Sequence, residues 1–232
     1  MAKIEKGYPL PSHTKLKYDE CHAKILLEKF FPEVYNDLQI SDRPDLRDVV
    51  NSVGVEVTSA IPQGEQEALA IACTIPYLSK KERERKITYL KAKGYDYGKY
   101  VMSHPPRGYA WTGSDYPDIE ITFCKDFLSA VKAKIKKLNS GKYAPLSRYD
   151  LLVLSEIDIE DWMPEKLLEK LISYKTEELN YSYIYLLALN GLFRFDIISR
   201  EWCVRGTQAD MFGLSWMARQ MVEDGETDDK TQ

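Results

Sequence analysis

Soft metal ligands are scarce in this chain. Four cysteines are present, and no two of them form a CxxC pair; they are Cys21, Cys73, Cys124 and Cys203. The three histidines do not have metal-ligand spacing either. A structural zinc site needs about four such ligands in close groups, so we do not expect one here. We expect the thiols to be reduced and mostly buried, which is typical of a cytoplasmic protein.

Long apolar runs and several common motifs are also missing. The longest apolar run, around 183–189, is too short to span a bilayer, and the early lysines are not followed by the apolar region of a secretory signal. We therefore expect a cytoplasmic protein that does not enter a membrane. GxGxxG, GxxxxGK[ST] and GxSxG do not occur. Their absence argues against the common nucleotide-binding and α/β-hydrolase sites.

Charge is distributed unevenly along the chain. The net charge is −4 at pH 7, but the segment after Val222 has five acids and one lysine, so the rest is formally neutral. Residues 79–99 hold eight Lys or Arg against three acids, and residues 125–142 hold six Lys against one Asp. Such clusters are commonly solvated helix faces, and they also permit a surface that binds phosphate groups.

Apolar periodicity predicts alternating helices and strands. Expected helices cover 16–31, 64–93 (interrupted at Pro76 and ended by Gly94), 124–139, 164–174 and 209–222. Expected strands cover 45–50, 53–59, 149–157, a hairpin over 181–198 with a type I′ turn at Asn190-Gly191, and 201–206. This order predicts one α/β domain over 1–222, in which helices flank a mixed central sheet. We expect a helical and loop insertion at about 62–118, and a disordered acidic tail at 223–232.

Two acidic residues on neighbouring predicted strands are the main candidates for chemistry. Asp45 follows Pro44, and after ten intervening residues Glu56 begins the run Glu56-Val57-Thr58 among valines. An unpaired charge in such a strand is costly. Glu20 lies in the apolar arc of the first helix, although a partly exposed acid is the plainer reading there. Hydrolysis of a phosphodiester with Mg²⁺ requires hard oxygen ligands that face one small volume, and these three acids could surround it.

The pattern resembles the PD-(D/E)XK superfamily of restriction endonucleases, junction resolvases and related nucleases, over roughly residues 16–60 and 124–190. The resemblance implies a restriction-endonuclease-like core and a nuclease that acts on DNA. It implies that Asp45 and Glu56 bind Mg²⁺ or Mn²⁺ and that Glu20 assists. Thr58 stands where the family has a lysine that positions or activates the attacking water. Some members carry this lysine on the helix that follows the strands.

One lysine of the helix at 124–138 has a suitable place for that role. A helical wheel puts Lys134 at the edge of the apolar face, whereas Lys132, Lys136 and Lys137 lie off it. We predict that Lys134 or Thr58 orients the nucleophile. A lysine that only extends its charge from the rim of an apolar face is an equally good reading of Lys134. If neither residue acts, the chain is an inactive nuclease fold that binds nucleic acid or protein.

The predicted insertion contains a loop rich in aromatic residues. Five tyrosines and Trp111 lie within 95–116. Such rings can stack on unpaired bases, but they can equally pack the loop against the body or bind a protein partner. The sequence does not separate these alternatives.

Overall fold

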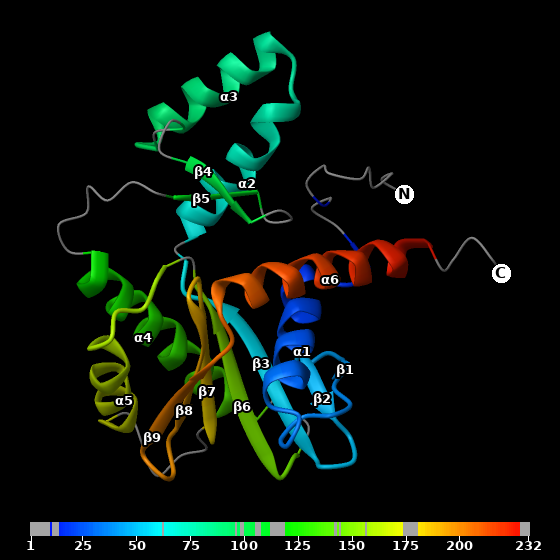
Figure 1. The fold of residues 1–232 in the computed structure, drawn as a ribbon, viewed down its shortest axis with the longest axis vertical. Helices are drawn as coiled ribbons and strands as arrows, with labels where there is room; N and C mark the ends of the chain where they lie inside the picture. The colour runs from blue at the N-terminus through cyan, green and yellow to red at the C-terminus, as the bar shows by residue number, and fades with distance from the viewer. Residues whose placement is uncertain are drawn as a thin grey trace.

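A computed structural model of the chain is shown in Figure 1. The structure describes residues 10, 14–61, 63–95, 97, 100–104, 108–111, 119–141, 143, 145–155, 157–173 and 181–227, with the backbone alone at 73, 100–104, 108–111, 119–122, 226 and 227. Its centre is a seven-stranded mixed sheet flanked by helices. The predicted α/β class is therefore confirmed.

The sheet combines parallel and antiparallel pairs. Its spatial order is β1 (Gln39–Ile40), β2 (Leu46–Asp48), β3 (Val53–Ser59), β6 (Arg148–Leu154), β7 (Tyr183–Ala188), β8 (Gly191–Asp196) and β9 (Glu201–Arg205). β3, β6 and β7 are parallel, and every other neighbouring pair is antiparallel. The parallel strands are buried along almost their whole length, as expected where helices cover both faces.

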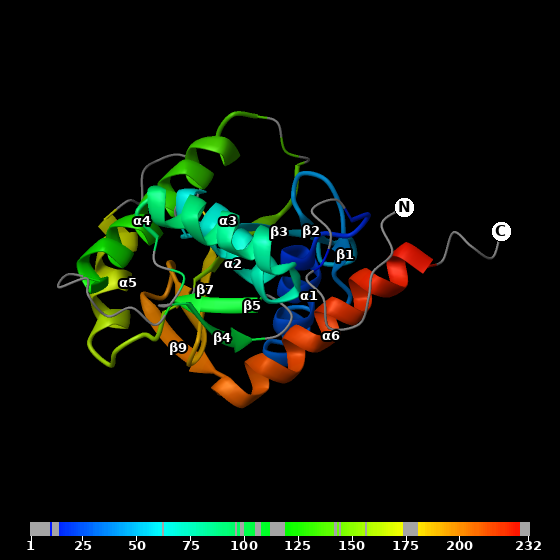
Figure 2. The ribbon, with the colours of Figure 1, turned by 90° about the horizontal axis from the view of Figure 1, so that it is seen from above.

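Helices cover the two faces of the sheet in pairs. α1 (Tyr18–Phe30) and α6 (Gln208–Thr227) cover one face, and α4 (Ile119–Leu138) and α5 (Met163–Ser173) cover the other (Figure 2). The side-chain alternation of β3 matches this division. Val53, Val55 and Val57 join the core beneath α1, so Glu56 and Thr58 face α4.

The segment between β3 and α4 forms an arm beyond the end of the sheet at which β3 finishes (Figure 1). It contains α2 (Gln63–Thr74), the 3-10 helix η1 (Ile75–Tyr77), α3 (Lys80–Ala92), β4 (Tyr100–His104) and β5 (Gly108–Trp111). Pro76 lies in η1 and separates the two helices, as predicted. Gly94, with φ +87°, follows α3 and allows the chain to leave the helix.

A small apolar cluster of its own stabilises the arm. Ala68, Ala72, Ile75 and Leu90 are buried in it, and Tyr95 and Tyr97 pack against it. Ser79 and Glu82 form a capping box at the start of α3. Tyr95 and Tyr97, which belong to the predicted aromatic loop, thus pack within the arm. The other aromatic side chains of the predicted loop lie outside the described residues.

Three predicted boundaries are corrected by the structure. α4 begins at Ile119, five residues early. In the β7–β8 hairpin, Ala188 pairs with Gly191, and neither residue between them has the positive φ of a type I′ turn. Asn190 instead exchanges two hydrogen bonds with the Ile159 backbone, at 2.9 and 3.0 Å. α6 continues to Thr227, so the first part of the expected disordered tail is helical, and residues 228–232 lie outside the described part.

The sequence predicted reduced, mostly buried thiols and a chain without a membrane-spanning segment. Cys21 is buried, Cys124 and Cys203 are partly buried, and all three are free thiols. Within the described ranges, no helix has both the length and the apolar stretch needed to cross a bilayer.

Gly54 tests how closely the Pro44-Asp45 turn lies over β3. A Cβ at this position would lie 2.5 Å from Pro44 Cγ and 2.7 Å from Leu146 Cδ1, and a proline ring cannot move aside easily. We expect Gly54→Ala to lower the free energy of unfolding, measured with urea, by about 1–3 kcal/mol. Gly213→Ala is the matched control, because Gly213 lies in α6 with open space around it. This change should raise stability by up to about 1 kcal/mol. An unchanged Gly54→Ala variant would contradict the close packing.

Candidate functional site

The ladder between β2 and β3 ends next to the candidate residues. Pairing runs only from Leu46 opposite Val55 to Asp48 opposite Val53, so the Val57 backbone has no partner strand on this side. Asp45 Oδ2 accepts the Val57 N–H at 2.8 Å, and Lys134 Nζ of α4 donates to the Val57 carbonyl at 3.0 Å. Buried backbone groups need such partners. The end of the ladder therefore holds one acid and one lysine in place.

Glu56 lies at the centre of this arrangement and is fully buried. Its Oε2 accepts hydrogen bonds from Lys134 Nζ at 2.7 Å and from Lys137 Nζ at 3.3 Å. Lys134 Nζ also lies 4.0 Å from Asp45 Oδ2. The structure thus brings Asp45, Glu56 and Lys134 together, from three different elements.

Burial and like charge dominate the electrostatics of the site. Burial raises the pKa of Asp45, and the nearby Glu56 charge raises it further, against the opposing effects of the Val57 N–H and Lys134. Burial and the Glu56 charge also raise the pKa of Tyr143 and Tyr181 well above the usual phenol range. The Tyr181 hydroxyl donates to the Lys134 carbonyl at 3.2 Å. Both phenols therefore stay neutral beside the carboxylates.

The oxygens around Lys134 fit a hard divalent cation. Two carboxylates, those of Asp45 and Glu56, and the Val57 carbonyl approach the same ammonium. Among the described residues, no three His, Cys, Asp or Glu side chains form a metal-binding group. Mg²⁺ commonly uses one or two carboxylates and completes its shell with water. Asp45, Glu56 and the Val57 carbonyl would therefore hold such an ion together with water.

Glu20 and Thr58 lie near this group but have different surroundings. Glu20 is 6 % exposed and pairs with Lys17 at 2.5 Å. Burial raises the pKa of Glu20, the Lys17 hydrogen bond opposes this effect, and the Asp45 charge adds a smaller rise. Thr58 follows Glu56 by two residues, faces the same side of β3 and is only partly buried. Glu56 accepts a hydrogen bond from Lys134, and neither Glu20 nor Thr58 does so in the described part of the chain.

The sequence did not indicate Lys137 or Tyr143. The helical wheel put Lys137 off the apolar face, yet its ammonium reaches Glu56 and lies 5.5 Å from the centre of the Tyr143 ring. Residues three apart on a helix are neighbours, and a long lysine side chain reaches round the helix from the flank. The spacing of Lys134 and Lys137 was the available signal. Tyr143 lies after α4, where no periodic pattern indicates a direction.

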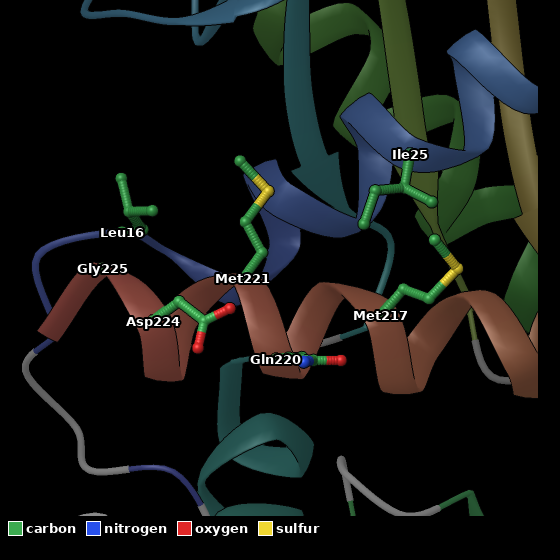
Figure 3. A pocket seen from close by; sticks show the side chains of 7 residues that line it. All are labelled: Leu16, Ile25, Met217, Gln220, Met221, Asp224 and Gly225. Carbon is green, nitrogen blue, oxygen red and sulfur yellow. The ribbon is translucent and has the colours of Figure 1, made fainter. Parts of the chain in front are cut away.

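A surface hollow of about 460 Å³ lies between α1 and α6, away from this group (Figure 3). Its lining is mainly apolar and thioether; the residues are Leu16, Ile25, Met217, Gln220, Met221, Asp224 and Gly225. None of the candidate site residues contributes to it. The hollow therefore belongs to the opposite side of the sheet from Glu56 and α4.

Asp45 gives a pH-dependent test of these electrostatics in the metal-free protein. Because its folded pKa is raised above the ordinary 3.8, ionised Asp45 destabilises the fold at neutral pH. We expect Asp45→Asn to raise the free energy of unfolding by about 1 kcal/mol at pH 7. This gain should shrink as the pH falls through the raised pKa, and vanish below 3.8, where wild-type Asp45 is also neutral.

Asp42→Asn is the control for this comparison. Asp42 is 90 % exposed on the same turn, and its removal should leave stability nearly unchanged at every pH. Glu20 titrates in all three proteins, and because the Asp45 charge raises its pKa, Asp45→Asn lowers that pKa and adds to the gain at neutral pH with the same sign. A gain for Asp45→Asn that does not depend on pH would contradict the raised pKa.

The comparisons with known proteins assign no family. No family model matches the chain. No curated protein and no solved structure matches it either. Its function must be argued from the chemistry of its own side chains, and that chemistry centres on Asp45, Glu56 and Lys134.

Proposed function

We propose that this protein is a divalent-metal-dependent nuclease of the PD-(D/E)XK type that hydrolyses phosphodiester bonds in DNA. The observation that carries the proposal is the meeting of Asp45 and Glu56 at one ammonium group, that of Lys134. These are the two acids and the lysine that the family resemblance implies. They come from the turn before β2, from β3 and from α4.

Each residue has a distinct role in this proposal. Asp45, Glu56 and the Val57 carbonyl hold Mg²⁺ or Mn²⁺, which polarises a phosphate oxygen when bound. Lys134 orients the attacking water, and the Thr58 hydroxyl on the same face of β3 is the alternative for that task. Glu20 assists from the first turn of α1, where it is coupled electrostatically to Asp45.

Two basic surfaces support DNA as the partner. On α3, the exposed charges include Lys80, Lys81, Arg83 and Arg85. On α4, the exposed Lys136 follows directly after the site, and Lys137 lies within it. Lysine and arginine that neutralise backbone phosphates give sequence-independent binding that weakens steeply with salt.

A binding module without catalysis is the second candidate. Thr58 stands where the family has lysine, and Lys134 is engaged by a fully buried acid. A buried ion pair of this kind can serve structure alone, because removing either partner leaves an uncompensated charge. In that case the fold binds nucleic acid or protein and hydrolyses nothing.

Cleavage assays with site variants separate the two candidates. We expect Asp45→Asn and Glu56→Gln each to reduce Mg²⁺- or Mn²⁺-dependent cleavage of DNA at least about 100-fold, because the amide keeps the shape and loses the charge that holds the ion. Lys134→Met should slow turnover by about 10²–10⁴. Thr58→Val should have a smaller effect, and Asp42→Asn none.

Two outcomes of these assays would change the proposal. A fully active Lys134→Met with an inactive Thr58→Val would transfer the water-orienting role to Thr58 and keep the nuclease. Wild-type protein that cleaves neither duplex, single-stranded nor branched DNA with either ion would reject catalysis and favour the binding module.

A further inference from the structure

Two lysine ammonium groups lie against the two carboxylates of the site. Lys134 Nζ lies 2.7 Å from Glu56 Oε2 and 4.0 Å from Asp45 Oδ2, and Lys137 Nζ lies 3.3 Å from the same Glu56 oxygen. Two ammonium groups carry the same total charge as one divalent ion. A divalent ion can therefore replace both without changing the charge of the site.

The ammonium groups and a metal ion would use the same oxygens. Lys134 already contacts the Glu56 carboxylate and the Val57 carbonyl, which are two of the three groups that would hold the ion. Cations about 3 Å apart repel strongly in a buried site. Glu56 is fully buried in β3, so its carboxylate cannot leave the site to resolve the conflict. The lysines have to move.

The two lysines differ in how readily they can leave. The side chain of Lys137 is 48 % exposed, and water can solvate its ammonium once it leaves Glu56. The side chain of Lys134 is 17 % exposed and has less access to water. A displaced Lys134 therefore needs another anion close by. The backbone phosphate of a bound nucleic acid supplies an anion of the right kind, next to the ion that it also contacts.

We propose that Lys134 and Lys137 are built-in counter-cations of the Asp45–Glu56 pair, displaced by a divalent ion and received by a backbone phosphate of the substrate. This inference rests on the proposed metal-dependent function. It makes metal binding weak in the absence of substrate. It also makes metal and phosphodiester strengthen each other's binding by the same factor, as linkage requires.

Binding of Mn²⁺ to the full chain, followed by the paramagnetic resonance signal of free Mn²⁺, tests the displacement. We expect Lys137→Gln to bind Mn²⁺ about tenfold more tightly than wild type, because one competing charge is gone, and Lys134→Gln more tightly still. Lys136→Gln is the matched control. Lys136 is an exposed lysine of the same helix, and its loss should change the affinity less than about twofold.

Thermal unfolding gives a readout that does not depend on activity. Metal-free Lys134→Gln should melt at a lower temperature than wild type, because Glu56 loses its closest partner. Mn²⁺ should then raise the melting temperature of this variant more than that of wild type. If Lys134→Gln does not fold, Lys137→Gln carries the test, because it leaves Lys134 in place.

The phosphate step is tested with two short single-stranded DNA oligonucleotides of one sequence. Phosphorothioate DNA keeps the backbone charge, whereas methylphosphonate DNA is neutral. The charged DNA should tighten Mn²⁺ binding to wild type, and the neutral DNA should not. The double variant Lys134→Gln, Lys137→Gln should lose this coupling, and the comparison between proteins removes Mn²⁺ that binds to the DNA itself.

The results distinguish this inference from the function on which it rests. Mn²⁺ binding that is equally tight in wild type, Lys134→Gln and Lys137→Gln would overturn the displacement and leave the metal site intact. Equal tightening by charged and neutral DNA would overturn the phosphate step. The absence of Mn²⁺ binding in wild type and in every variant would reject the metal-dependent function itself.

Discussion

The fully buried carboxylate of Glu56, in the middle of a sheet strand, is the constraint on which the rest of the site depends. A buried charge must be compensated by nearby charge and hydrogen bonds, or it destabilises the fold by several kcal/mol. Here the compensation comes from Lys134 and Lys137, which lie on α4, 78 and 81 residues further along the chain. The packing of α4 on β3 therefore has an electrostatic component as well as an apolar one.

The same constraint explains why β2 is short. If β2 continued alongside β3 past Val55, it would occupy the Val57 N–H and carbonyl. These groups are instead taken by Asp45 and Lys134. Gly54 allows the turn that carries Asp45 to lie against β3, since any Cβ there would overlap Pro44. A strand end, a glycine and a helix thus combine to place two acids and one lysine together.

Local pattern predicted much of this arrangement. The alternation of valines along 53–59 put Glu56 on the opposite side of the strand from those valines, and the helical wheel put Lys134 at the edge of the buried side of α4. Those two inferences depend only on the periods of strand and helix. The class of the fold followed from the same periods.

The features that sequence missed depend on contacts between distant segments. A helical wheel gives the direction in which each side chain leaves the helix, but not how far a long side chain extends. It therefore did not show that the Lys137 ammonium would contact Glu56. The β-branched residues Ile119 and Ile121 obscured the start of α4. The Asn190 side chain makes hydrogen bonds to the Ile159 backbone, and rules for local turn sequences do not include such a distant contact. The Lys17 partner of Glu20 is likewise visible only in the structure.

Anomalous X-ray scattering from crystals grown with both Mn²⁺ and a short single-stranded phosphorothioate DNA locates the ion and shows where the two lysines lie. We expect one strong Mn²⁺ peak between Asp45 and Glu56, with oxygens at about 2.0–2.2 Å that include the Val57 carbonyl. The ammonium of Lys134 should have moved away from Glu56 in that crystal. Crystals in which the carboxylates still hold both lysines, and in which Mn²⁺ binds elsewhere or not at all, would contradict a metal site at Asp45 and Glu56.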